Sequence, residues 1–308
     1  MRHRQVLVTL GAILALSTVA GPAFAEDLED YLEKAADADY AGTRVVVTVW
    51  QGRSVAEMTR VEHSSDVMML GAPGFEAVIV DGKVARGEDP GVALAGWSAV
   101  AISDRYTVGA VAEADRLGRA AHAVQILEEG VLRARIVFDS TTWAPLVTEI
   151  FDDQGTLFRI ASFTDFDPHP RRVYEEAGDA GRDYEVVTGS SESSLPATAA
   201  GYSRVDMYAD ADGVHQAFFS DGFFSFSVFE VAPRQVRQRF DGAATITVEG
   251  ADYRVMVRPS ELWVAWEHGP TGYVLVGDLP PDHLRDVLGD LPEPRQKGLW
   301  ERIFGFFG

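Results

Sequence analysis

The sequence contains no cysteine and no asparagine in 308 residues, and only three lysines, Lys34, Lys83 and Lys297. Without cysteine the chain can form no disulfide, no thiolate metal site and no lipid-modified N-terminal cysteine. It also lacks the H-E-x-x-H, G-x-S-x-G and Walker A motifs, and no G-x-G-x-x-G follows a predicted strand. These absences argue against an enzyme, and we expect no cofactor.

The first 25 residues predict a secretory signal peptide. Arg2 and Arg4 precede an apolar run over residues 6–20, and small residues stand at an A-x-A position that ends at Ala25. The run is shorter than the roughly 20 residues that a membrane-spanning helix needs. We therefore expect export across the cytoplasmic membrane, and a soluble mature protein in the periplasm or another extracytoplasmic space. An uncleaved membrane anchor is the alternative.

The balance of charge is strongly acidic, with 27 Lys and Arg against 47 Asp and Glu and a formal net charge of −20. Removal of the signal peptide takes away two arginines and no acid, which gives 25 − 47 = −22 for the mature chain. Such a surface repels nucleic acid and anionic membranes and attracts basic protein segments. We expect no nucleic-acid partner, and membrane association only through a protein partner. A simpler interpretation is that the charge keeps the surface solvated.

Residues 26–166 have the pattern of one helix followed by a curved antiparallel sheet. Apolar residues recur at helical spacing within residues 27–39, and from residue 44 the period changes to two, with Val45, Val47 and Val49 on one face. Further strands are predicted at 75–80, 105–111, 121–127, 132–139 and 146–151, and a hairpin crosses Gln154-Gly155. Many antiparallel strands with few helices indicate a strongly curved sheet.

Residues 167–194 are rich in Pro, Gly, Ser and charged residues and poor in large apolar side chains, so we expect them to form a linker. A second domain, residues 195–308, follows the linker. It contains predicted strands at 244–248, 253–257, 262–266 and 273–276 and a helix that begins near Pro281. Its last ten residues, 299–308, are rich in aromatic side chains, and we expect them to dock onto this domain, a partner or a membrane.

Residues 215–230, HQAFFSDGFFSFSVFE, predict a β-hairpin. Two runs rich in Phe flank Ser220-Asp221-Gly222, and Asp-Gly between apolar runs is a strong hairpin signal because both central positions of its tight turn favour positive φ. After the turn, large apolar residues fall on both faces of the strand. We therefore expect this strand to have neighbours on both sides.

The segment SDG followed by FSFSVFE resembles the C-terminal domain of the MucB/RseB family of extracytoplasmic sigma-factor regulators. Three N-terminal features are also similar to that family: Y-x-G-T at residues 40–43, RVEH at residues 60–63, and a passage with D-x-x-T, P-L and D-x-x-G within residues 132–164. The resemblance implies an α+β protein, mainly antiparallel β. Its N-terminal domain is expected to be an unclosed curved β-barrel with helices, like that of LolA-type lipoprotein carriers, followed by a smaller α+β domain.

The resemblance also implies a function, because members of the family are not catalytic. They bind the outward domain of a membrane anti-sigma factor and respond to lipid or lipoprotein signals. The expected partner-binding residues lie on the hairpin: Asp221, Gly222, Phe224, Phe226 and Phe229. The expected lipid cavity, whose residues would equally suit an ordinary core, is lined by Val45, Val47, Val49, Met68, Met69 and Leu70. Two alternatives stay open: a lipid or lipoprotein carrier without a sigma-factor role, and an envelope interaction protein without a ligand.

Overall fold

The structure is a computed structural model, and it describes residues 27–64, 67–72, 75–80, 83–86, 102–170, 185–186, 194–209 and 214–294. The predicted signal peptide, most of the predicted linker and the aromatic tail lie outside the described residues. Within the described ranges, no helix is both long enough and apolar enough to span a membrane.

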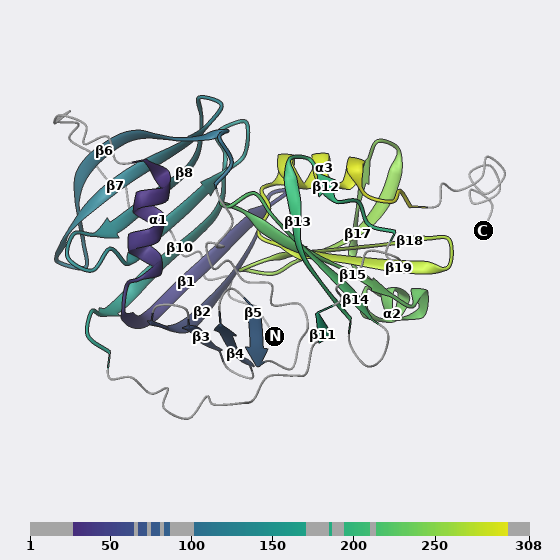
Figure 1. The fold of residues 1–308 in the computed structure, drawn as a ribbon, viewed down its shortest axis with the longest axis horizontal. Coiled ribbons are helices and arrows are strands. Elements are labelled where there is room, and N and C mark those ends of the chain that lie inside the picture. The colour runs from purple at the N-terminus through teal and green to yellow at the C-terminus, as the bar shows by residue number, and fades with distance from the viewer. Residues whose placement is uncertain are drawn as a thin grey trace, which may run out of the picture.

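The described residues form two antiparallel sheets that lie side by side along the long axis of the molecule (Figure 1). The first sheet has ten strands in the order β5-β4-β3-β2-β1-β10-β9-β8-β7-β6. Its strands are β1 Tyr40–Trp50, β2 Arg53–Ser64, β3 Val67–Ala72, β4 Phe75–Val80, β5 Lys83–Arg86, β6 Tyr106–Arg116, β7 Arg119–Glu128, β8 Val131–Asp139, β9 Pro145–Phe151 and β10 Leu157–Asp167.

The first sheet carries helix α1, Leu28–Ala36, on one face. The helix begins where the sequence predicts, because Asp27 and Asp30 form a capping box in which each side chain accepts a hydrogen bond from the other residue's backbone N–H. Its apolar stripe packs into the core, and the ring of Tyr31 stacks on Phe138 of β8 at 5.8 Å. We call this side, which includes Val46 and Ile136, the helix face.

The opposite face of the first sheet is the concave side of the curve formed by strands β6 to β10. The Arg116 guanidinium of β6 donates hydrogen bonds to Ser162 Oγ and Phe163 O of β10, both at 2.8 Å. Since β6 and β10 are four strands apart in the sheet, these contacts require the sheet to curl toward this side. Val137 of β8 is buried there together with small side chains such as Ala123 of β7. We call this side the furrow face.

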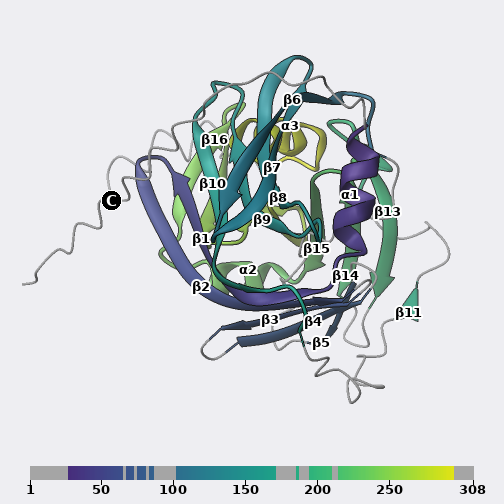
Figure 2. The same ribbon diagram turned by 90° about the vertical axis from the view of Figure 1, so that its left-hand side faces the viewer.

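The second sheet has nine strands, in the order β11-β13-β14-β15-β19-β18-β17-β16 with β12 paired to β13. Figure 2 shows it behind the first sheet when the molecule is viewed from the end at which the first sheet lies. Its strands are β11 Glu185–Val186, β12 Thr198–Ala199, β13 Tyr202–Ala209, β14 His215–Ser220, β15 Ser225–Val231, β16 Ala244–Val248, β17 Ala251–Val257, β18 Leu262–His268 and β19 Thr271–Gly277. Its helices are α2, Pro233–Arg239, and α3, Pro281–Asp290.

Both faces of the second sheet are covered. Val236 of α2 packs with Phe229 and Trp263 on one face. The other face joins α3 and the helix face of the first sheet in one continuous apolar core, which contains Phe219 of β14 and Phe138 of β8. The two sheets therefore share a core. We call the region where they meet the junction, and it also contains polar contacts between the sheets.

The predicted fold class is confirmed: the described part of the chain is mainly antiparallel β, with three helices and sheets that do not close. β15 lies between β14 and β19, so the hairpin strand has the two expected neighbours. Within the predicted linker, Glu185–Val186 form β11 and pair with β13. That short strand adds part of the linker segment to the edge of the second sheet.

Candidate functional site at the junction of the two sheets

The turn between β14 and β15 is built by the side chain of Asp221. Its Oδ1 accepts hydrogen bonds from the backbone N–H groups of Phe223 and Phe224, at 2.9 and 2.7 Å. Ser220 Oγ accepts from the Gly222 N–H at 3.0 Å, and Gly222 has φ 87°. The loop spans four residues, 221–224, between the strands, rather than the two residues of the predicted tight turn, because Asp221 supplies side-chain acceptors for its backbone.

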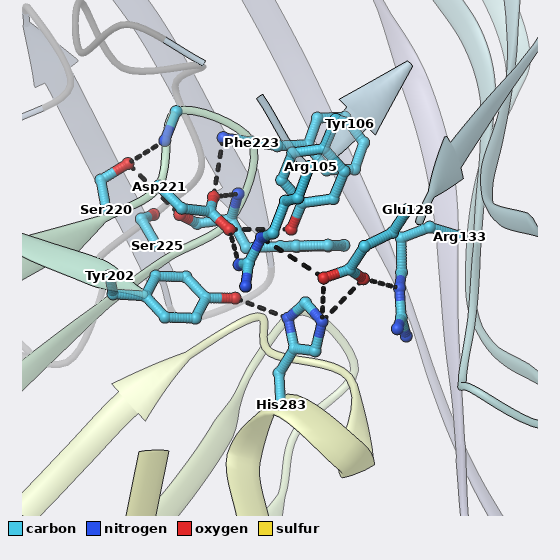
Figure 3. A network of polar contacts seen from close by, with 12 residues as sticks. Arg105, Tyr106, Glu128, Arg133, Tyr202, Ser220, Asp221, Phe223, Ser225 and His283 are labelled. Atoms are coloured by element: carbon cyan, nitrogen blue, oxygen red, sulfur yellow. Dashed lines mark hydrogen bonds and ion pairs between the residues drawn. The ribbon is translucent and has the colours of Figure 1, made fainter. Parts of the chain in front are cut away.

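The second oxygen of Asp221 faces the first sheet (Figure 3). Asp221 Oδ2 accepts from the Tyr106 hydroxyl at 2.7 Å and from Nη2 of Arg105 in a short ion pair. The backbone adds another bond, from Ser103 N–H to Asp221 O at 2.9 Å. One buried carboxylate thus shapes the turn of the second sheet and binds it to the start of β6.

A second part of the junction centres on Glu128, at the end of β7 (Figure 3). Arg133 Nε donates to Glu128 Oε2 at 2.5 Å, and the other end of the same guanidinium binds Asp282 of α3 in a bidentate pair at 2.8 and 3.1 Å. His283 Nε2 lies 2.8 and 3.0 Å from the two oxygens of Glu128. Arg105 Nε also pairs with Glu128 at 3.3 Å, which joins the Glu128 and Asp221 groups into one network.

The hydrogen bonds assign the protons of His283. Because an ionised carboxylate only accepts, the Nε2 atom that faces Glu128 carries a proton. The other ring nitrogen, Nδ1, lies 2.6 Å from the hydroxyl of Tyr202, which donates to it when the ring is neutral. His283 therefore connects α3 to strands of both sheets.

Burial and charge shift the pKa values in this network. Burial alone would raise the pKa of Glu128, but the hydrogen bond and charge of His283 and the charges of Arg133 and Arg105 hold it below its ordinary value. Burial raises the pKa of the Tyr106 hydroxyl, and the charge of Asp221 raises it further. Tyr106 thus stays a neutral hydrogen-bond donor to Asp221. These buried groups bind one another, which suits a structural contact between the sheets rather than catalysis.

Another polar group, which we call the Arg159 cluster, lies elsewhere along the junction. Arg159 Nε of β10 donates to Thr48 Oγ1 at 2.9 Å, and that hydroxyl donates to Pro259 O at 2.6 Å. Ser260 Oγ donates to Glu57 of β2 in a short bond. Arg159 Nη1 reaches the backbone oxygen of Asp278, just after β19, at 3.4 Å. The loop after β17 and the end of β19 are thereby attached to the helix face of the first sheet.

The five residues predicted to bind a partner lie in or behind this junction. Asp221, Phe224, Phe226 and Phe229 are buried, with exposed fractions of 4, 2, 0 and 6%, and Gly222 is buried with them. Phe224 lies edge-on to His283, and Phe229 lies on the opposite face of the sheet, beside α2. Their partner-binding role stays a prediction, and in this conformation no partner can reach their side chains.

The six residues predicted to line a lipid cavity fall on two strands. Val45, Val47 and Val49 share the furrow face of β1, where Met58 of β2 lies directly opposite Val45. Val49 and Met58 are 37 and 59% exposed. Met68, Met69 and Leu70 are consecutive in β3, and their side chains lie outside what the structure describes. The predicted cavity stays a prediction, and the three valines supply the part of it whose surface is described.

Comparison with known proteins gives likenesses among solved structures only, since neither a protein-family model nor a curated protein matches the chain. A crystal structure of MucB has a TM-score of 0.54 and 19% identity, covering 85% of this chain and 95% of that chain. A structure of MucB in complex with MucA(peri) has a TM-score of 0.50 and 19% identity, covering 87% and 98%. The Pseudomonas aeruginosa MucA/MucB complex has a TM-score of 0.47 and 17% identity, covering 87% and 99%. The described chain has the fold of MucB.

Proposed function

We propose that this protein is an extracytoplasmic regulator that binds the outward domain of a membrane anti-sigma factor in an extracytoplasmic-function sigma-factor pathway. The observation that carries the proposal is the likeness to MucB in complex with MucA(peri), which extends over 87% of this chain and 98% of that chain. A match over both sheets supports a shared architecture better than a match to one domain would. The predicted signal peptide at residues 1–25 gives the expected location.

The junction limits how a partner engages the hairpin. Because Asp221 and Phe224 are buried against the first sheet, contact through them requires the two sheets to separate. A partner that binds the junction in its present state must use other surfaces. We infer that the hairpin holds the two domains in one arrangement, and that the partner recognises that arrangement.

The furrow face supports a lipid-responsive role. Val45, Val47, Val49 and Met58 place apolar side chains together on a curved face, where Met58 is more than half exposed. Exposed apolar side chains that gather on one surface are typical of interaction sites, and Met adapts to varied apolar ligands. We propose this surface as the site of an acyl chain.

A carrier of lipids or lipoproteins without a sigma-factor role is the second candidate, and the same furrow face supports it. The two candidates differ in their partners. The regulator binds a single-pass membrane protein that has a cytoplasmic sigma-binding domain, whereas the carrier binds lipid or acylated protein alone. The acidic net charge of the chain favours a basic segment on the partner, so binding to the anti-sigma factor should weaken as salt rises.

The test is a pull-down with the mature chain, residues 26–308, from detergent-solubilised envelope. Bound proteins and the organic extract are identified together by mass spectrometry. Enrichment of a single-pass membrane protein with a cytoplasmic sigma-binding domain is the expected result. Recovery of lipid or lipoprotein without such a protein would contradict the regulator and support the carrier. A matched control uses Met58→Ser, which should retain the protein partner and reduce bound acyl chains.

A further inference from the structure

The edge strands of the two sheets differ greatly in length. Strands β5, β11 and β16 contain four, two and five residues, whereas β6 contains eleven. Among the described residues, no strand pairs with the outer side of β6. Folded proteins keep edge strands short or place Lys or Pro on them, because unpaired backbone groups invite another chain to pair, and β6 contains neither residue. Of these edges, β6 is therefore the best suited to accept an added strand.

The register of the β6–β7 hairpin shows which backbone groups of β6 face outward. Arg116 and Arg119 flank a two-residue turn in which both residues have positive φ, 56° and 69°. In such a hairpin the flanking residues form a hydrogen-bonded pair, and bonded and non-bonded pairs alternate from there along the strands. The backbone N–H and C=O groups of Val111, Glu113 and Asp115 therefore face away from β7. They form a row of donors and acceptors beyond the bulge that interrupts β6 between residues 108 and 111.

The side chains along this row carry negative charge. Glu113 and Asp115 are exposed and share one face of β6, because they are two positions apart. Arg116 does not neutralise them, since its guanidinium lies on the furrow face and donates to β10. Pairing of two copies of this edge would place acid opposite acid, which is destabilising across a ladder, whereas Lys or Arg opposite these acids is stabilising. The edge therefore disfavours self-association and favours a basic strand.

We propose that β6 accepts an extended, basic segment of the anti-sigma factor's outward domain as an added strand, paired along residues 111–116. This inference rests on the proposed function, which supplies the partner. The backbone groups of β6 provide the hydrogen bonds, and the two acids provide the preference for Lys and Arg. Pairing at this edge leaves the junction closed, because it needs none of the buried hairpin side chains to become exposed.

Hydrogen exchange at single residues tests the pairing. The probe is the outward domain identified by the envelope pull-down, added to the mature chain, residues 26–308. The amides of Val111, Glu113 and Asp115 should exchange rapidly in the free chain and at least about tenfold more slowly in the complex. The amides of Ala112 and Ala114 face β7 and should change little. Because only an added strand protects alternate amides, unchanged exchange at the three outward positions would overturn the proposal.

Isothermal titration of the same domain into variants tests the edge independently. Glu113→Pro removes an outward N–H and no bond to β7, at a kind of edge position where proline is tolerated, and should weaken binding by about tenfold or more. Glu113→Gln keeps the N–H and removes only the charge, so it should weaken binding by about two- to threefold at low salt and by less at high salt. The matched control is Thr245→Pro, at an exposed outward position of β16, which should bind like the unsubstituted chain.

The outcomes separate this inference from the proposed function. Equal affinity of a folded Glu113→Pro and the unsubstituted chain would overturn the added strand and leave the regulator standing. Equal losses in Glu113→Pro and Thr245→Pro would also overturn it, because the effect would not belong to β6. Absence of binding by the unsubstituted chain would contradict the proposed function and this inference together. If Glu113→Pro failed to fold, the exchange pattern of the unsubstituted chain would decide the question.

Discussion

The two polar regions of the junction differ in how their charged side chains are paired. In the Asp221 network, carboxylates meet guanidinium groups, a tyrosine hydroxyl and His283 at hydrogen-bond distance. In the Arg159 cluster, the guanidinium binds a hydroxyl and a backbone oxygen, and the Asp278 carboxylate has no direct ion pair at hydrogen-bond distance. Well-paired carboxylates such as Glu128 keep a lowered pKa in spite of burial, whereas burial raises the pKa of the poorly paired Asp278 to about 6.

The largest expected effect comes from removal of the carboxylate that both shapes the turn and pairs with the first sheet. Asp221→Ala leaves Nη2 of Arg105 and the Tyr106 hydroxyl without their acceptor and should lower the free energy of unfolding by about 4 kcal/mol. Urea denaturation measures this, with Asp286→Ala as the exposed control. A loss of less than about 1 kcal/mol would contradict the close pairing described for this network.

Arg133 offers an internal comparison within one strand. Arg133→Met should cost about 3 kcal/mol, because it leaves Asp282 buried without its bidentate partner. Arg135→Met, two positions along β8, removes a partly exposed pair with Glu149 and should cost less than about 1 kcal/mol. Equal losses in urea denaturation would show that the buried ion pair at the junction contributes no more to stability than the partly exposed pair.

The two regions should also respond to pH in opposite directions. The folded-state pKa of Glu128 is lowered, so its contribution to stability is present above the ordinary glutamate value of 4.5 and is lost as pH falls. Glu128→Gln should therefore be less stable than the unsubstituted chain by about 1 kcal/mol at neutral pH, with the difference shrinking below about pH 4.5. Burial raises the pKa of Asp278 to about 6, so Asp278→Asn should be more stable than the unsubstituted chain above about pH 6, with the difference shrinking as pH falls toward 3.8. Denaturation series at matched pH values would contradict this contrast if both variants followed the same trend.

The smallest effect on stability is expected outside the junction. Met58→Ser changes a side chain that is 59% exposed on the furrow face and should alter the free energy of unfolding by no more than about 0.5 kcal/mol. Binding of a fluorescent fatty acid should nevertheless weaken, because the variant interrupts the apolar surface beside Val45. Unchanged fatty-acid affinity in the variant would contradict the proposal that the furrow face binds an acyl chain.

Sequence patterns predict the elements of this fold well, because those patterns are local. The strands at 75–80 and 244–248 have the predicted bounds, and the hairpin at 215–230 forms where Asp-Gly interrupts two apolar runs. The turn itself differs from the predicted one because the Asp221 side chain caps the loop backbone. A hairpin rich in Phe suits both a partner surface and a core, and its burial in this structure depends on distant residues.

The junction could not be predicted from the sequence, because its pairs are far apart along the chain. Arg133 and Asp282 are separated by 149 positions, and Glu128 and His283 by 155. One local sign was available: Arg133 interrupts the apolar strand VLRARIVF, and a charge within such a strand requires a partner when buried. Glu128, beside the turn at Gly130, has no comparable sign.

Binding of the outward domain of the anti-sigma factor recovered from the envelope pull-down tests the central claim most directly. Isothermal titration of that domain into the purified mature chain should give a saturable isotherm, with affinity that decreases as salt is raised because the chain is strongly acidic. The Met58→Ser variant should give the same isotherm, since its change lies on the furrow face. Absence of binding at low salt, with both proteins folded, would contradict the proposal that this chain regulates an anti-sigma factor.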